Sequence, residues 1–210
     1  MRALVLCDDY WHPAATPRNG LSALSESGIT FDWIEDAKSW SSERMSEYPL
    51  VILTKSNNVS ATNPVPWMTP AVEDAFVSYV NAGNGLLVIH SGAAGYQENL
   101  RLRALMGGVF LQHPAQCDVT HEPLIGHPLT GGVSVFTERD EHYHMAMDDT
   151  NADVFLTSRS EHGEQPAGWT RREGAGRVCM LTPGHNLEVW LHPMYQKLLQ
   201  NVMEWCVHYP

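Results

Sequence analysis

The clearest pattern along the chain is a series of short, almost wholly apolar runs that open into polar loops. These runs occupy residues 3–7, 48–54, 86–89 and 176–181. Continuous apolar runs of this length are typical of strands buried on both faces of a parallel sheet. A further strand is predicted over residues 29–36, where apolar and polar side chains alternate.

Amphipathic segments between these runs predict the helices. Thr69 is a suitable N-cap with Pro70 at the first helical position, and an apolar stripe follows. A shorter helix is expected over residues 20–27, and a closing amphipathic helix over residues 192–209. Residues 57–68 are rich in Asn, Ser, Thr and Pro, so we expect a long surface loop there.

The order of these elements predicts an α/β protein with a doubly wound, mostly parallel sheet flanked by helices. Residues 109–161 depart from this order, because short alternating segments indicate extra β-strands and little helix. With 210 residues, 43% of them hydrophobic, the chain suits one domain spanning residues 1–210.

Composition restricts the partners and the cell compartment. The formal net charge is −11 and no basic run exceeds the pair Arg171 and Arg172, so nucleic acid and anionic membranes are poor partners. No apolar stretch approaches the roughly 18 residues of a membrane-spanning helix, and the first apolar run is too short for a signal peptide. The four cysteines lack CxxC spacing and are expected to be small, buried hydrophobic side chains. We therefore expect a reduced, cytoplasmic protein.

Polar side chains follow the ends of several buried strands. Ligands of open α/β sheets bind beyond the carboxyl ends of the strands, where loops from separate strands meet. The candidates at these positions are His12, Lys55, His90, Ser91 and His185. Two histidines at one sheet edge, each beside a glycine turn, are more often functional than structural. We therefore expect a small-molecule site at this edge.

The dense polar segment RDEHYH at residues 139–144 is open to three interpretations. If it is extended, Asp140, His142 and His144 share one face of a strand, and both imidazoles could bind one metal ion with Asp140 or a water completing the shell. Glu141 and Tyr143 then share the opposite face and offer a general acid or base beside an aromatic ring. The third interpretation is a solvated edge strand whose charged side chains have no chemical role.

Three other residues have both a functional and a structural interpretation. His113 precedes a proline, which places it in extended backbone from which it could face the site. Trp190 either stacks against the face of a sugar or covers the core. Ser91 does not fit the nucleophile elbow of serine hydrolases, because that motif has glycine two positions earlier and Ile89 stands there.

Five motifs, HSG, GGVFLQHP, GHPLTGG, RDEHYH and PGHNLEVWLHP, resemble in order the landmarks of the trehalose-utilisation (ThuA-like) family over nearly the whole chain. The resemblance implies a flavodoxin-like fold similar to that of class I glutamine amidotransferases. In those enzymes the strand-to-helix elbow reads Gly-Ile-Cys-x-Gly, and here His90 stands at the position of the nucleophilic cysteine. Because an imidazole cannot form the thioester of that reaction, we expect no glutaminase activity.

The resemblance further implies a role in carbohydrate catabolism, on a disaccharide or an oxidised sugar, as a hydrolase, lyase or isomerase. His90, Glu141 and His185 are the predicted catalytic residues, either around a divalent ion (Zn, Mn or Fe) or as proton donors and acceptors without one. The residues predicted to bind the substrate are His12, Lys55, Ser91, His113, Tyr143 and Trp190.

Two alternatives to an enzyme stay open from the sequence. One is a non-catalytic sugar-binding or regulatory module that kept an amidotransferase-like fold. The other is a structural subunit whose acidic surface and exposed aromatic side chains serve assembly. A small-molecule carbohydrate is the expected ligand of the enzyme and of the sugar-binding module. A homodimer is a reasonable assembly for all three classes.

Overall fold

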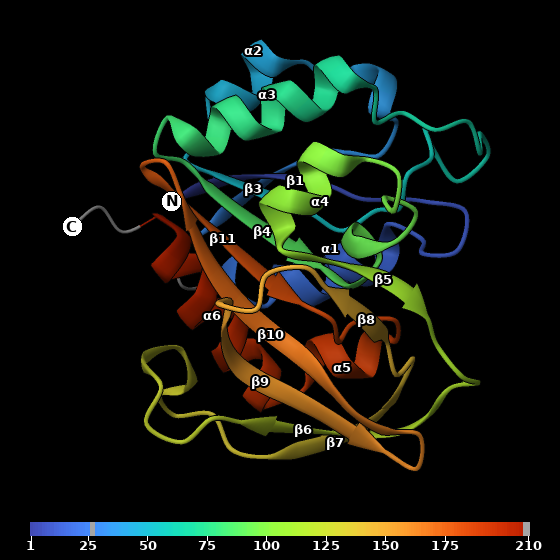
Figure 1. The fold of residues 1–210 in the computed structure, drawn as a ribbon, viewed down its shortest axis with the longest axis vertical. Helices are drawn as coiled ribbons and strands as arrows, with labels where there is room; N and C mark the ends of the chain where they lie inside the picture. Colours follow the sequence, from blue (N-terminus) through green and yellow to red (C-terminus); the bar gives the residue numbers. More distant parts are fainter. Residues whose placement is uncertain (26–27, 208–210) are drawn as a thin grey trace.

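The structure is a computed structural model that describes residues 1–25 and 28–207 (Figure 1). Its centre is a nine-stranded sheet in the order β2-β1-β3-β4-β11-β10-β9-β6-β7. Its parallel part consists of β1 (Arg2–Leu6), β2 (Thr30–Ile34), β3 (Leu50–Leu53), β4 (Gly85–Ile89) and β11 (Gly176–Leu181). Its antiparallel part consists of β10 (Gly163–Glu173), β9 (Asp153–Ser160), β6 (Cys117–Pro123) and β7 (Phe136–Asp140). A separate two-stranded sheet pairs β5 (Gly108–Gln112) with β8 (His144–Met147).

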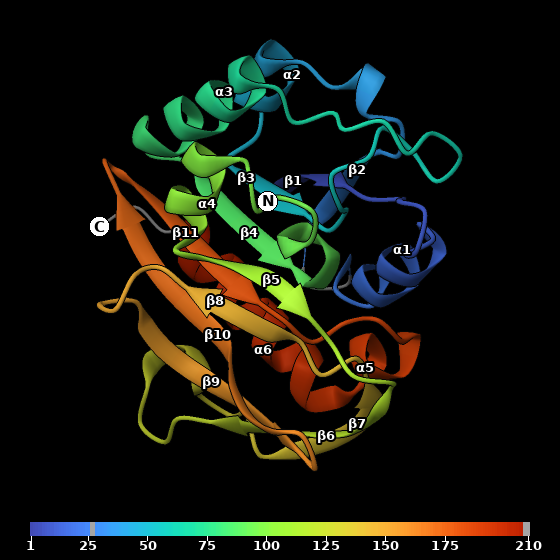
Figure 2. The ribbon, with the colours of Figure 1, turned by 45° about the vertical axis from the view of Figure 1, so that its right-hand side comes forward.

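Helices cover both faces of the sheet, as Figure 1 and the turned view in Figure 2 show. One face packs against α2 (Ser42–Ser46), α3 (Pro70–Asn81) and α4 (Leu100–Met106). The other packs against α1 (Ala15–Ser22), α5 (Leu187–Leu191) and α6 (Pro193–Val207). Short 3-10 turns lie at η2 (Ala37–Ser39), η3 (His90–Ala93) and η4 (Pro128–Thr130).

The two helical layers explain why the parallel strands are apolar at every position. In β1, Leu4 and Leu6 belong to the core beneath α3, whereas Ala3 and Val5 belong to the core beneath α6. Successive side chains of a strand point to opposite faces, so a strand covered on both sides has no solvent-facing position. The predicted α/β fold with a parallel, helix-flanked sheet is confirmed.

Two of the predicted helices are confirmed, and one is displaced. The Thr69 side chain accepts a hydrogen bond from the backbone N–H of Val72 and caps α3, and α6 closes the fold. In place of the helix expected over residues 20–27, the structure has α1, which begins earlier and ends at Ser22. Residues 26 and 27 lie outside the described residues. Gly20 does not begin this helix. A Cβ on it would lie 2.5 Å from Cβ of Trp190, so glycine is needed there for close packing.

The central segment contains the extra strands that the sequence predicted for residues 109–161. Strands β6, β7 and β9 join β10 in the antiparallel half of the large sheet. Helix α4 just before this segment was not predicted. Three of the four cysteines are buried as expected, but Cys117, the first residue of β6, is only half-buried. No helix among the described residues is long and apolar enough to cross a membrane.

The chain makes a sharp turn where β4 ends, and this turn brings His90 to the sheet edge. His90 has φ +47°, a left-handed conformation that is uncommon for a residue with a side chain. Two residues later, Gly92 passes directly over the end of β3. A Cβ at Gly92 would overlap the carbonyl oxygen of Leu53 and lie 2.8 Å from its carbonyl carbon. The turn therefore needs glycine at position 92.

We expect Gly92→Ala to lower the free energy of unfolding by about 2 kcal/mol or more, because the backbone of β3 cannot yield as a side chain would. Urea denaturation of the variant and the wild type measures the difference. Gly131→Ala is the matched control, since a Cβ there has only one neighbour, the Pro128 carbonyl oxygen at 3.6 Å. Equal losses in the two variants would contradict the steric explanation.

A second prediction concerns His121, whose ring is buried in β6 with Nδ1 3.2 Å from Oγ of Ser158. Burial lowers the pKa of His121 to about 3. Below about pH 6.5 the unfolded chain binds a proton at this residue that the folded protein does not bind, so stability falls as the pH drops. This loss amounts to about 2 kcal/mol by pH 5.

His121→Gln should therefore lose about 2 kcal/mol less stability than the wild type between pH 7 and pH 5. Urea denaturation at both pH values gives the comparison, and only the difference between the pH values matters. His162→Gln, at an exposed position, should behave as the wild type does. Parallel stability curves for His121→Gln and the wild type would refute the assignment.

Candidate functional site

Four side chains from distant parts of the sequence meet at the carboxyl edge of the parallel strands. His12 follows β1, His90 follows β4 and His185 follows β11, whereas Glu141 follows the antiparallel strand β7. One ligand atom from each of the four lies within 4.8 Å of the others. We call these four residues the His–Glu cluster. The structure thus brings together the three predicted catalytic residues and His12, which was predicted to bind substrate.

The ring of His90 is held in place from two sides. Its Nδ1–H donates to the carbonyl oxygen of Thr182 at 2.7 Å, which turns Nε2 toward the cluster. The Tyr143 ring stacks on it with a centroid separation of 4.1 Å. His90 Nε2 is buried and has no hydrogen-bond partner among the described residues.

His12 is oriented by the buried carboxylate of Asp9. Its Nδ1–H donates to Oδ1 of Asp9 at 2.8 Å, and Nε2 faces the cluster without a hydrogen-bond partner in the described chain. Burial lowers the pKa of His12, and the neighbouring His90 and His185 add to this effect, against the opposing influence of Asp9. His12 is therefore neutral and presents a free lone pair near pH 7.

Glu141 supplies the negative charge of the cluster. Its Oε2 lies 3.4 Å from Nε2 of His90, and its Oε1 lies 3.1 Å from Nδ1 of His185 and 3.5 Å from Nε2 of His113. Burial opposes ionisation, but interactions with His185 and His90 outweigh it and hold the pKa of Glu141 well below its usual range. The Glu141 carboxylate in turn raises the pKa of His185, against the effect of burial.

These contacts leave ring nitrogens of the histidines without hydrogen-bond partners. Nδ1 of His185 and Nε2 of His90 lie within ion-pair distance of Glu141, yet neither has the geometry of a hydrogen bond. Buried polar atoms without partners are rare in native proteins and call for an explanation. Such atoms, gathered around one carboxylate, form a set that could hold a metal ion.

Asp140 holds the turn that carries His185. Its fully buried carboxylate accepts hydrogen bonds from the backbone N–H groups of Gly184 at 2.8 Å and His185 at 2.9 Å. Burial raises the pKa of Asp140, while the neighbouring His90 and these N–H groups oppose the rise.

This arrangement decides between the interpretations of the RDEHYH segment. Strand β7 ends at Asp140 and β8 begins at His144, so the strict alternation of an extended strand does not hold between them. His142 interacts with Oγ of Ser160 at 2.7 Å and not with Asp140. The Asp140 carboxylate therefore does not join His142 and His144 in a metal site, because it accepts from the turn at Gly184 and His185. The solvated edge strand was wrong, since Asp140 and His142 are buried. Glu141 and Tyr143 point to the cluster, as in the second interpretation.

Three predicted substrate-binding residues lie away from the cavity. The fully buried ammonium of Lys55 donates to the carbonyl oxygens of Asp8, Glu35 and Val59. Lys55 thus joins loops and cannot reach a substrate, because its donors are already used. Trp190 is fully buried with Nε1–H bonded to the Gly184 carbonyl oxygen, so it covers the core. The buried side chain of Ser91 does not line the cavity either.

The cluster opens into a cavity of about 550 Å³, within the size range of small-molecule sites. Of the predicted residues, its walls contain His12, His113, Glu141, Tyr143 and His185. Sequence reasoning missed seven further wall residues, which are Trp11, Ser56, Asn57, Asn58, Ala94, Gly95 and Phe110. The available signal for Trp11 was the aromatic pair Tyr10–Trp11 in the loop after the first strand. The available signal for Asn57 and Asn58 was their pairing in the loop at residues 57–68.

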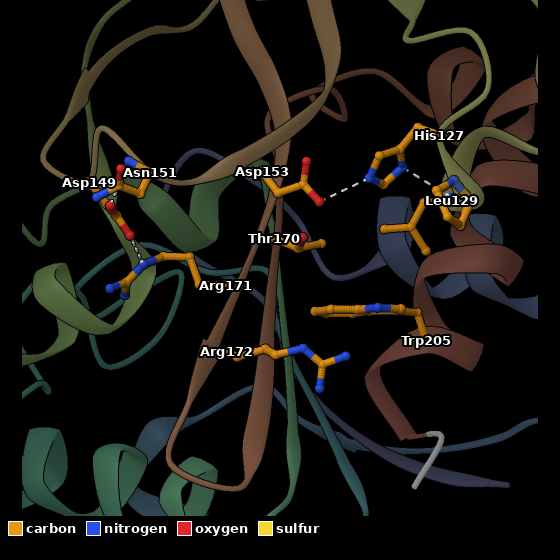
Figure 3. A pocket seen from close by; sticks show the side chains of 10 residues that line it. His127, Leu129, Asp149, Asn151, Asp153, Thr170, Arg171, Arg172 and Trp205 are labelled. Carbon is orange, nitrogen blue, oxygen red and sulfur yellow. Dashed lines mark hydrogen bonds and ion pairs between the residues drawn. The ribbon is translucent and has the colours of Figure 1, made fainter. Parts of the chain in front are cut away.

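A second groove of about 520 Å³ lies along β10 and α6 (Figure 3). Its charged side chains largely pair with one another. His127 lies 3.2 Å from Asp153, and Nε of Arg171 lies 2.6 Å from Asp149. None of its residues belongs to the His–Glu cluster.

Solved structures with this fold include a protein from Bacteroides uniformis described as ThuA-like and a cytoplasmic protein from Salmonella typhimurium. The first has a TM-score of 0.73 at 20% identity and covers 99% of this chain and 91% of its own. The second has a TM-score of 0.72 at 15% identity and covers 98% of each chain. At these identities the similarity establishes the fold alone.

A glutamine amidotransferase from Thermotoga maritima also shares the fold, with a TM-score of 0.62 at 13% identity over 100% of this chain and 99% of its own. The prediction of a glutamine amidotransferase-like fold is therefore confirmed. No curated protein matches the chain.

The family comparison covers almost all of the sequence. Residues 2–206 match the ThuA family, which is described as trehalose utilisation. The match includes every residue of the His–Glu cluster and every strand of the sheet. The chain therefore belongs to the ThuA, or trehalose utilisation, family.

Proposed function

We propose that the protein is an enzyme of carbohydrate catabolism in which the His–Glu cluster binds a divalent metal ion and acts on a sugar. The observation that carries this proposal is the set of buried imidazole nitrogens from His12, His90 and His185, which face one carboxylate without hydrogen-bond partners. The family match supports the sugar as substrate.

The residues behind the cluster fit a metal site. A histidine that binds a metal ion usually donates its other ring N–H to a carboxylate or a backbone carbonyl, which fixes the tautomer and the ring orientation. Asp9 accepts from His12 in this way, and the carbonyl of Thr182 accepts from His90. Both imidazoles are thus already in the form that binds a metal ion.

The spacing and chemistry of the four ligands are also suitable. Ligand atoms bound to one ion at about 2.1 Å are at most about 4.2 Å apart. The observed limit of 4.8 Å therefore requires only a small contraction of the cluster. Imidazole and carboxylate together suit Zn, Mn or Fe.

The residues of the cavity then have distinct roles. A bound divalent ion would polarise a carbonyl or hydroxyl oxygen of the sugar. The Glu141 carboxylate, with its low pKa, stays ionised and holds the charge of the site. His113 is partly exposed at the cavity wall and lies 3.5 Å from Glu141, so it can exchange a proton with solvent. Tyr143 fixes the plane of the His90 ring.

Glutaminase activity is not part of this proposal. The elbow after β4 carries an imidazole at position 90, and the cysteines lie elsewhere in the described chain. Without a thiolate at the elbow the thioester of that reaction cannot form. We further propose a cytoplasmic location, since the Salmonella typhimurium protein with this fold is described as cytoplasmic. The homodimer stays a prediction.

We expect the wild-type protein, purified without a histidine tag or chelator, to contain about one equivalent of Zn, Mn or Fe. His90→Ala and His185→Ala should each lose most of this metal, because a missing ligand weakens the site by orders of magnitude. Elemental analysis of the three proteins provides the test. His162→Ala, which removes an exposed histidine, is the control and should keep its metal. A wild type that binds no added ion would refute the metal site.

Turnover is tested with Glu141→Gln, and the metal content of the same variant is measured alongside. We expect this variant to fold normally and to lose turnover by about 100-fold or more, because the charge facing the histidines is removed. The assay uses a panel of disaccharides, trehalose among them, and their oxidised derivatives. Glu161→Gln at an exposed position should be unaffected. Sugar binding without turnover in the metal-loaded wild type would instead support the non-catalytic sugar-binding module.

A further inference from the structure

Resting on the proposed function, we propose that the hydroxyl of Tyr143 donates a hydrogen bond to an oxygen of the sugar beside the His–Glu cluster. The acceptor would be a carbonyl, hydroxyl or ring oxygen with a lone pair turned toward the cavity wall. Tyr143 would thus have two roles, since its ring holds His90 and its hydroxyl holds the sugar.

Tyr143 differs from the other buried tyrosines of the described chain, because its hydroxyl has no hydrogen-bond partner there. The other four hydroxyls donate to a backbone carbonyl oxygen or accept from a guanidinium, and they belong to Tyr48, Tyr79, Tyr96 and Tyr195. Burying a hydroxyl without a partner has a free-energy cost that phenylalanine would avoid. Packing alone therefore does not explain why position 143 carries a hydroxyl.

This hydroxyl can be reached from the cavity. Tyr143 is only 2% exposed, and it lines the cavity of about 550 Å³. Nε2 of His90 and Nδ1 of His185 are fully enclosed as well as partnerless, but the Tyr143 oxygen does not belong to that enclosed set. The small exposed area of the residue thus includes its hydroxyl, and a ligand in the cavity can contact it.

The ring that carries the hydroxyl is held in place by its neighbours. It stacks on His90 with ring centroids 4.1 Å apart, and it contacts Phe110 at the same separation. Phe110 belongs to β5, which pairs with β8 directly after Tyr143. The two-stranded sheet therefore keeps the ring beside the cluster, so little ordering is needed when a ligand binds.

The hydroxyl is available as a donor. A tyrosine with an ordinary pKa of about 10 keeps its proton at pH 7. Burial raises the pKa of Tyr143 further, and the nearby charges of Glu141, Asp140 and Asp9 add to the rise. Asp9 and Asp140 accept from backbone N–H groups, and no hydrogen bond joins Tyr143 to any of these carboxylates. The proton thus remains for an acceptor that a ligand brings.

The cavity also connects Tyr143 with the cluster. His12, Glu141 and His185 line its wall, whereas His90 does not. An ion held by all four residues would therefore have His90 behind it and the cavity in front. A sugar oxygen at the cluster would then lie in the cavity whose wall carries the Tyr143 hydroxyl, and one sugar can contact both.

The test uses Tyr143→Phe, which removes the hydroxyl and keeps the ring. Calorimetry on the metal-loaded proteins measures binding of trehalose and of the other sugars of the panel. We expect the variant to bind about tenfold or more weakly than the wild type. Its metal content and its urea midpoint should not fall, because the hydroxyl bonds no described residue of the chain.

Tyr79→Phe is the matched control. The Tyr79 hydroxyl donates to the carbonyl oxygen of Tyr48 at 2.9 Å, and Tyr79 does not line the cavity. This variant should lower the urea midpoint and leave sugar binding unchanged. If Tyr143→Phe loses its metal, fails to fold or loses as much stability as Tyr79→Phe, the hydroxyl has a structural role and the proposal is refuted.

The proposed contact and the metal-dependent function fail in different ways. If Tyr143→Phe binds sugar as tightly as the wild type, the contact is refuted and the metal site stands. If the wild type contains no metal but Tyr143→Phe still weakens sugar binding tenfold, the contact is supported and the metal-dependent function is refuted. A metal-loaded wild type that binds no sugar of the panel refutes the contact and leaves the metal site intact.

Discussion

A carboxylate removed from water must have its charge met by hydrogen bonds from within the protein, and this constraint organises the whole sheet edge. Asp9 accepts from the backbone of Trp11, His12 and Ser56 as well as from the ring of His12. Asp140 accepts from the turn that carries His185. In both cases the donors belong to the loops that present the histidines, so satisfying the buried charge also positions the site.

The sheet could be predicted from the sequence because burial on both faces leaves an unmistakable apolar run. Helix boundaries could be predicted less well from the sequence than strands. The sequence pattern predicted a helix beginning at Gly20. In the structure Gly20 lies inside α1 and lets this helix approach Trp190, a contact between residues 170 positions apart in the chain. Likewise, the antiparallel strands could be predicted as strands, whereas their pairing depends on neighbours that local patterns do not specify.

In the site, too, some residues could be predicted from local sequence and others depend on distant parts of the chain. His90 and His185 could be predicted because they directly follow buried strands, whose ends meet at one edge. Lys55 follows such a strand too, yet its side chain turns inward to three backbone carbonyls, a choice that depends on where other loops pass. Asn58 could not be singled out, because its position in a loop does not reveal that the residue will line a cavity.

The long separation between His12 and His185 also has a consequence for biosynthesis. The two residues become neighbours only after β11 has inserted between β4 and β10, and β11 is the last strand along the chain. When three quarters of the sequence has been synthesised, His12, His90 and Glu141 are present but His185 is not, so the cluster is incomplete. Contacts of such high sequence separation form late in folding. The four side chains of the cluster can thus come together only after residue 185 has emerged from the ribosome.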